Sequence, residues 1–282
     1  MKILVTLDAK DYSKNILKDV ARLAGNTLAD IVFLGVQDET TQAPKQSLVK
    51  TLLKYQNDVY SYFSPEDLPY AAFSSDRLEE KGKGDWAISA KGMKEFTLRI
   101  KSGSVAKQTI DVAEEMDCDL VILGCSGKIG CEWDGEMNVP LRIAKDAPCS
   151  ALVIKQTKRT NQIVSILDHT VVSQNSLEMI NQLVTLNDAG LKIVGVQKKK
   201  DSKKAEVEKR MVELLKYYND REINVWVKVL DSEEVKKYVT NSSREAIVAL
   251  WMGKESLLKM LFSQSMVDKL LETTKSSLLI LR

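Results

Sequence analysis

Two glycines and an aspartate stand where a parallel sheet would bind a ligand. Gly124 and Gly127 follow the apolar run 120–123, and Asp8 follows the apolar run 2–7. Glycine lets the backbone approach a phosphate closely, and the next helix would offer unpaired N–H donors. The pattern suggests a mononucleotide site. Two alternatives stay open, because Asp8 is also an ordinary helix-capping residue and a lone G-x-x-G also makes a tight loop.

The elements that must position these residues are predicted by hydrophobic periodicity. Apolar residues recur at helical spacing between Tyr12 and Ala24, and the segments 105–116 and 139–145 are also typical of helices. Strands that are apolar throughout and alternate with amphipathic helices are typical of a parallel sheet covered on both faces. We therefore predict a doubly wound α/β fold. Its expected strands are residues 2–7, 31–36, 95–100, 120–123 and 151–154.

This arrangement occurs twice in the chain. The segment 3–8 returns as 163–168, and the segment 34–37 returns as 194–197, so both matches share one spacing. A constant, gapless spacing indicates duplication of a whole folding unit. We predict two tandem doubly wound parallel-sheet domains, at 1–157 and 161–282. They are expected to pair about a pseudo-two-fold axis, which would cover the open edges of their final strands.

The first copy is the longer one. The closing segments 147–154 and 274–281 match at a smaller spacing than the opening segments, so the second copy is shorter between them. With Arg99 aligned to Trp226, the difference is placed in an insertion at about 41–94. Its aromatic residues are expected to pack a helical lid on the sheet, with an interaction surface as the alternative. They are Tyr55, Tyr60, Tyr62, Phe63, Tyr70, Phe73 and Trp86.

Composition narrows the class of protein. The 41 Lys and Arg against 39 Asp and Glu give a formal charge of +2, which calls for neither nucleic acid nor an anionic membrane. No apolar run approaches the roughly 18 residues of a membrane-spanning helix. The N-terminus is expected to enter a strand at once, so no signal peptide is expected. We expect a cytoplasmic protein.

Residues that could bind a metal or act as nucleophiles are few. No cysteine pair has C-x-x-C spacing, and the single histidine is His169, so no metal site is predicted. No nucleophile can be assigned near His169, so no catalytic residue is predicted. Cys125 and Cys131 bracket a glycine-containing loop where a disulfide is one interpretation, but we expect both to be reduced and dispensable. Cys118 and Cys149 flank apolar strands and are expected in the core.

The opening and closing segments of the first copy make the chain resemble a tandem universal stress protein. The opening strand that ends in Asp8 and the closing Ala-Pro-Cys-x-x-Leu-Val pattern at 147–153 carry the resemblance, which covers nearly the whole chain except 41–94. It implies an adenine nucleotide alpha hydrolase-like fold that binds AMP or ATP in the first domain. The residues it implies are Asp8 and Val36 for the adenine, and Gly124, Gly127, Asn138 and Val139 for the sugar and phosphates.

The chain also departs from the family pattern. Nucleotide-binding members carry G-x-x-G, nine residues and then G-[ST], but Met137 and Asn138 stand at the last two positions here. We therefore expect few contacts to the distal phosphates, and AMP to bind about as well as ATP. The second copy is expected to be degenerate and to have lost nucleotide binding. Its glycine positions become Trp251, Lys254 and Gln264, and only Ser265 is retained.

The leading functional hypothesis is a non-enzymatic stress-response or regulatory protein that binds an adenine nucleotide in its first domain. One alternative is an interaction scaffold that binds no nucleotide. Another is a weak ATP-hydrolysing enzyme, against which Met137 and Asn138 argue. The expected partners are the nucleotide and an unidentified protein, but neither nucleic acid nor membrane. The chain would form an intramolecular pseudo-dimer, with a homodimer also open.

Overall fold

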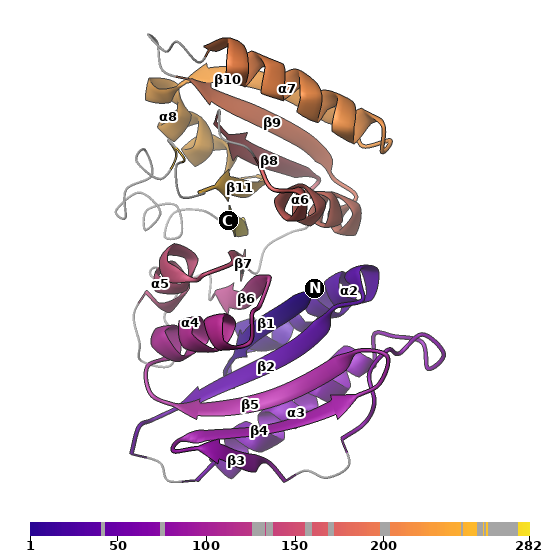
Figure 1. Ribbon diagram of the computed structural model, residues 1–282, viewed down its shortest axis with the longest axis vertical. Coiled ribbons are helices and arrows are strands. Elements are labelled where there is room, and N and C mark those ends of the chain that lie inside the picture. The colour runs from indigo at the N-terminus through magenta and orange to yellow at the C-terminus, as the bar shows by residue number, and fades with distance from the viewer. Residues whose placement is uncertain are drawn as a thin grey trace. The chain divides into compact units, whose positions relative to one another are not determined.

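The chain forms two compact units, residues 1–156 and 157–282 (Figure 1). Each unit is described by itself. The computed structural model describes residues 1–40, 43–73, 77–125, 133, 138–155, 160–168, 172–197, 204–243, 245–252, 256, 258 and 276–282.

The first unit alternates strands and helices. Its helices are α1 (Asp11–Asn15), α2 (Leu17–Thr27), α3 (Gln46–Tyr60), α4 (Val105–Glu115) and α5 (Val139–Asp146). Its strands are β1 (Lys2–Leu7), β2 (Asp30–Gln37), β3 (Glu79–Gly82), β4 (Asp85–Lys91), β5 (Glu95–Ser102), β6 (Leu120–Cys125) and β7 (Ser150–Lys155).

The second unit repeats the alternation. Its helices are α6 (Gln174–Asn187), α7 (Lys204–Asn219) and α8 (Ser232–Ser242). Its strands are β8 (Gln162–Leu167), β9 (Gly190–Gln197), β10 (Val225–Asp231), β11 (Ile247–Trp251) and β12 (Leu278–Leu281). The helix predicted at 266–271 lies outside the described residues.

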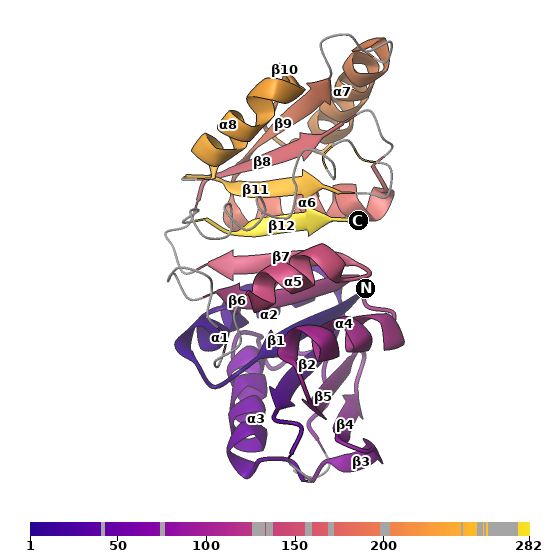
Figure 2. The same cartoon turned by 90° about the vertical axis from the view of Figure 1, so that its left-hand side faces the viewer.

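Both units are built on the same five-strand parallel sheet. The strand order is β7-β6-β1-β2-β5 in the first unit and β12-β11-β8-β9-β10 in the second (Figure 2). Ile3 lies opposite Ile31 in the first sheet, and their duplicates Ile163 and Leu191 lie opposite each other in the second, so the register is preserved. Apart from the edge strand β10, these strands are almost wholly buried, as strands covered on both faces must be. The predicted α/β doubly wound fold is confirmed.

The first long helix of each unit ends in the same way. Helix α2 buries one apolar stripe and ends at Leu28, whose φ of 47° is left-handed. Helix α6 ends at Asp188, the duplicate of Leu28, and its φ is 49°. A left-handed residue is the common way to end a helix, although leucine rarely adopts it. The predicted stripe from Tyr12 to Ala24 is divided between α1 and α2 at Ile16.

The insertion expected at 41–94 is narrower than predicted. Helix α3 crosses from β2 to the parallel strand β5, just as α7 crosses from β9 to β10, so it belongs to the repeated pattern. The extra chain of the first unit is therefore 61–94. It contributes the hairpin β3–β4, whose second strand pairs antiparallel with β5 and extends the sheet. The sequence alignment missed this because it included the α3 segment in the insertion.

Strand registers also correct the position of the alignment. Phe96 lies opposite Ile31, and Val225 lies opposite Leu191, so Phe96 corresponds to Val225. The sequence alignment had instead paired Arg99 with Trp226, whereas the register pairs Arg99 with Lys228. The two copies return to the sequence alignment at the starts of α4 and α8. The difference is the link Gly103–Ser104, because α8 begins directly after β10.

The aromatic residues of 41–94 pack largely as predicted. Tyr60 and Tyr70 stack at 5.9 Å between ring centroids, and both meet Phe96 of β5 edge-on at 5.5 Å. Phe73 also packs edge-on against Phe96. Tyr62 differs, because half of its surface is exposed. The set therefore fastens α3 and the following connection to the sheet.

Candidate functional site

A cavity of about 530 Å³ opens at the carboxyl ends of β1, β2 and β5 in the first unit. Parallel α/β sheets bind their ligands at this edge, and the volume is in the range of small-molecule sites. Its lining combines apolar side chains with a few polar groups. The lining residues are Leu7, Asp8, Ala9, Val36, Gln37, Asp38, Lys45, Ser47, Leu48, Thr51, Gly103, Val105 and Trp133.

Asp8 is held in place by the turn that follows β1. Its Oδ1 accepts hydrogen bonds from the Lys10 N–H at 3.0 Å and from the Ser13 hydroxyl at 2.7 Å, and its Oδ2 accepts one from the Tyr12 hydroxyl. The backbone N–H of Asp8 donates to Ser13 Oγ in return. A carboxylate offers about four acceptor positions, so one remains for a ligand. Asp8 is therefore a preorganised acceptor at the wall of the cavity.

Trp133 also lines the cavity, and it lies near the end of β6. Its indole N–H donates to the Gly124 carbonyl at 2.9 Å, and its ring lies 5.2 Å from the Tyr12 ring. Gly124 itself packs against α1, because a Cβ there would collide with the Tyr12 carbonyl. The missing side chain of Gly124 thus serves close packing of backbone, whatever it does for a ligand.

The cavity brings together only some of the predicted site residues. Asp8 and Val36 line it, and Gly124 reaches it through Trp133. Asn138 has a left-handed φ of 61° directly before α5, and Val139 is fully buried at the first position of that helix. Neither lines the cavity. Gly127, like Met137, lies outside the described residues.

Sequence reasoning did not identify the polar lining residues Gln37, Asp38 and Lys45. Gly103 has a φ of 136°, which favours glycine, and its N–H donates to the Gln37 carbonyl at 2.8 Å. The Gln37 side chain accepts from the Lys45 backbone N–H at 2.9 Å and thereby fixes the start of α3. Lys45 Nζ is 2.6 Å from Asp38 Oδ2 in an exposed ion pair.

At the equivalent edge of the second unit, the aspartate is buried among the described residues. Asp168 has no exposed surface, and its Oδ2 accepts a hydrogen bond from Ser256 Oγ at 2.7 Å. The Leu258 N–H donates to the same Ser256 oxygen at 3.1 Å. Trp251, at the position of Gly124, is buried in the same region. His169, Lys254, Gln264 and Ser265 lie outside the described residues.

The cysteines correct one prediction. Cys125 is fully buried at the end of β6 and is disulfide-bonded, so the expectation that it is reduced was wrong. Sequence spacing alone does not show which thiols meet in space. Cys131 lies outside the described residues. Neither Cys118 nor Cys149 forms a disulfide. Burial raises the pKa of the Cys118 thiol to about 11, which makes it a poor nucleophile at neutral pH.

The described residues contain no group of three or more His, Cys, Asp or Glu side chains that could hold a metal ion. Nor does that part of the chain include a helix long and apolar enough to cross a membrane.

Comparison with known proteins identifies the family. The model of the universal stress protein family matches residues 1–155, which is more than half of the chain. The chain belongs to the universal stress protein family. A curated member, universal stress protein MJ0531 from Methanocaldococcus jannaschii, is 24% identical over 170 residues, covering 56% of this chain and 98% of that protein.

Solved structures match the whole length. A universal stress protein from Archaeoglobus fulgidus superposes with a TM-score of 0.61 at 12% identity, covering 100% of this chain and 96% of that one. A putative universal stress protein from Pseudomonas aeruginosa gives a TM-score of 0.59 at 12% identity, covering 99% and 92%. At this identity the likeness shows the fold alone.

Proposed function

We propose that the first unit binds an adenine nucleotide, AMP or ATP, in the cavity beside Asp8, as a non-enzymatic stress-response protein. The observation that carries the proposal is the coincidence of the 530 Å³ cavity with Asp8 and Val36, the residues that the family pattern assigns to the adenine. Apolar walls from Leu48, Val36 and Trp133 suit a flat base. The open acceptor position of Asp8 suits the exocyclic amine of adenine.

We further propose that the second unit is a degenerate universal stress protein domain that binds no nucleotide. Asp168 is buried and accepts a hydrogen bond from Ser256, and Trp251 occupies the position that Gly124 has in the first unit. Pairing of the two units about a pseudo-two-fold axis and a cytoplasmic location remain predictions. The disulfide at Cys125 argues against a strongly reducing compartment.

A second candidate is an interaction scaffold without nucleotide. The observation that favours it is the local satisfaction of Asp8, whose three hydrogen bonds to Lys10, Tyr12 and Ser13 suffice for a purely structural turn. In that case the cavity would result only from the way α3 connects β2 to β5, and it would hold no ligand.

Titration calorimetry with AMP, ATP and IMP separates the two. IMP carries a carbonyl where AMP carries the amine, so an accepting Asp8 should bind IMP at least about tenfold more weakly, the scale of one hydrogen bond to a charged group. AMP and ATP should bind about equally. Failure of all three to bind would leave the scaffold, and phosphate release from ATP would indicate the enzyme.

Matched variants locate the site. Asp8→Asn should weaken AMP binding about tenfold or more, by loss of a charge-assisted hydrogen bond, and should narrow the preference for AMP over IMP. Asp168→Asn, at the equivalent strand end, should leave AMP binding unchanged. Tyr12→Phe keeps the ring but removes one internal donor to Asp8, and it should also leave binding intact. Equal losses in Asp8→Asn and Tyr12→Phe would mean that the turn, and not a ligand contact, was disturbed.

A further inference from the structure

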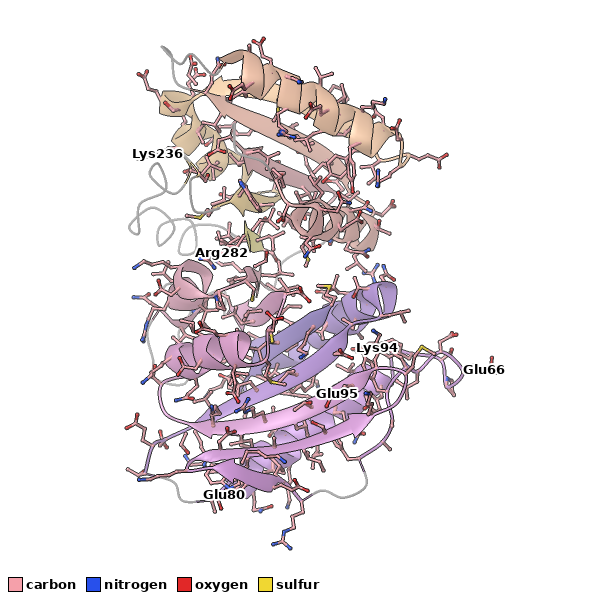
Figure 3. The ribbon with its side chains drawn as sticks, viewed as in Figure 1. Glu66, Glu80, Lys94, Glu95, Lys236 and Arg282 are labelled. Atoms are coloured by element: carbon pink, nitrogen blue, oxygen red, sulfur yellow. The ribbon has the colours of Figure 1, made fainter. Side chains whose placement is uncertain are left out.

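The outer edges of the two sheets differ. In the first unit the seven residues of β4 pair antiparallel with β5, and β3 continues the sheet beyond them. In the second unit β10 ends the sheet, and none of the described residues pairs with its outer side. Figure 3 marks the hairpin by Glu80 and the helix α8 beside β10 by Lys236. An open edge strand is a template for pairing with another strand.

The backbone groups on this edge can be assigned. The Leu191 N–H donates to the Asn224 carbonyl at 2.9 Å, and Leu191 lies opposite Val225. Because backbone direction alternates along a strand, every second residue from Asn224 bonds to β9. The N–H and C=O groups of Val225, Val227 and Val229 therefore point away from the sheet.

In the first unit, the corresponding edge is paired with another strand. By strand register, the residues of β5 that correspond to these valines are Phe96, Leu98 and Ile100. They lie opposite residues of β4 in antiparallel register, and Ser102, the next in the series, donates its N–H to the Gly84 carbonyl at 2.8 Å. The same set of groups is thus paired in one unit and open in the other.

We propose that β10 pairs antiparallel with β10 of a second copy of this chain, in a register centred on Val227. Two-fold symmetry makes such an edge self-complementary. Val227 would face its own copy, Val225 would face Val229, and Trp226 would lie across from Lys228 of the partner subunit. Trp226 is 66% exposed and Lys228 is exposed beside it, on one face of the strand. An indole and an ammonium group attract each other as a cation–π pair.

The side chains favour this register over the two that follow it along the strand. A pairing centred on Lys228 would set two ammonium groups directly opposite each other, which is destabilising. A pairing centred on Val229 would place Lys228 against Leu230 and leave Trp226 beyond the strand. The register centred on Val227 supplies two symmetric Trp226–Lys228 contacts and no like-charge pair. A strand of seven residues makes a small interface, so we expect a weak, reversible dimer.

Sedimentation equilibrium of the full chain over a wide concentration range tests the proposal. Trp226→Lys creates two like-charge pairs and should weaken the dimer by roughly tenfold or more, whereas Trp226→Glu creates two opposite-charge pairs and should retain it. The double variant Trp226→Lys with Lys228→Glu should restore the dimer. Val227→Pro removes an outward N–H but no bond to β9, so it should abolish the dimer and keep the fold. Circular dichroism checks the fold of each variant.

Three outcomes would overturn the proposal. The first is a wild-type chain that stays monomeric at millimolar concentration. The second is equal weakening by Trp226→Lys and Trp226→Glu, which would mark a simple apolar patch. The third is a dimer that survives Val227→Pro in a folded protein, because its interface would then lie elsewhere. None of these outcomes depends on nucleotide binding by the first unit.

Discussion

The two units have the same five-strand sheet, but they differ in what surrounds the carboxyl ends of its strands. In the first, the aspartate after the first strand is held by its own turn, through Tyr12 and Ser13, and stays at the wall of a cavity. In the second, Asp168 is covered by Ser256, a residue from beyond β11, and has no exposed surface. The same residue at the same register is therefore an accessible acceptor in one unit and a buried structural group in the other.

The helices that follow explain part of this difference. Helix α1 begins at Asp11, whereas α6 begins only at Gln174, later than the duplicate of Asp11 would stand. The early start brings the Tyr12 backbone against Gly124, where only glycine fits. The late start of α6 is compatible with Trp251 at the equivalent position. Survival of a motif residue thus says little until its surroundings are known.

The outer edges differ as well, and they allow the comparison to be tested most strongly. Arg99 is buried and binds Asp85 of the hairpin, with Nε at 2.9 Å from Oδ1, and it also binds Glu115 of α4 at 2.8 Å. Lys101 lies 3.4 Å from the same Asp85 carboxylate. Lys228, the counterpart of Arg99, is exposed, with its ammonium group 5.4 Å from the centre of the Tyr238 ring.

The largest expected effect comes from Arg99→Ala. It leaves the buried Asp85 carboxylate without its main partner and should lower the free energy of unfolding by about 3–5 kcal/mol, as for other broken buried ion pairs. The matched change Lys228→Ala should cost less than about 0.5 kcal/mol, since it removes an exposed contact. Urea denaturation of both variants measures the difference.

A double variant sharpens this result. Arg99→Met combined with Asp85→Leu removes both charges and should recover much of the stability lost in Arg99→Met alone, because no uncompensated charge stays buried. Similar costs for Arg99→Ala and Lys228→Ala would show that the hairpin does not bury this ion pair in solution.

The next effect tests the packing of Gly124. Gly124→Ala places a methyl group against the Tyr12 carbonyl, whose carbon lies 2.8 Å from the ideal Cβ position. The backbone of α1 must shift, so we expect a loss of about 1–3 kcal/mol in the free energy of unfolding. The control is Gly82→Ala, where a Cβ would meet no atom within 4 Å and should change little. A neutral Gly124→Ala would contradict the close approach of α1 to β6.

These contrasts also show how far the sequence could be interpreted. Buried parallel strands and amphipathic helices have distinct periods, so the α/β fold and nearly every core element could be predicted. The hairpin β3–β4 was missed, although the alternating strand 85–91 and the turn between Gly82 and Gly84 are a usable signal. The link Gly103–Ser104 was also missed, and because it separates β5 from α4 by two extra residues, the alignment paired Arg99 with Trp226.

The site itself was predicted only where it depends on strand ends. Asp8 and Val36 could be found because the ends of parallel strands meet at one edge. Trp133 and Ser256 could not be found, since each reaches its partner across a connection with no periodic pattern. The disulfide at Cys125 belongs to the same class of contact. Pattern reasoning therefore positions the backbone well and says little about which side chains close or open a cavity.

The smallest effect is a pH dependence confined to the first unit. Burial raises the pKa of Asp85, but the hydrogen bonds from Arg99 and the charges of Arg99 and Lys101 outweigh it, so the net pKa lies below its usual range. A carboxyl group with a lowered pKa in the folded state stabilises the fold above its unfolded pKa of about 3.9. That stabilisation is lost as the pH falls through the lower, folded value.

Asp85→Asn removes the titrating group, so the stability gap between wild type and this variant should be largest near neutral pH. It should shrink as the pH drops below about 4, where the unfolded carboxyl group becomes protonated. The second unit supplies the control. The hydrogen bond from Tyr217 lowers the pKa of Glu178, but that side chain is 43% exposed and solvent screens the interaction. Glu178→Gln should therefore leave the acid limb of the stability curve nearly unchanged, as measured by urea denaturation at a series of pH values. If Glu178→Gln flattened the acid limb as much as Asp85→Asn, the buried ion pair of Asp85 with Arg99 would contribute no more to the pH dependence of stability than an exposed carboxylate does.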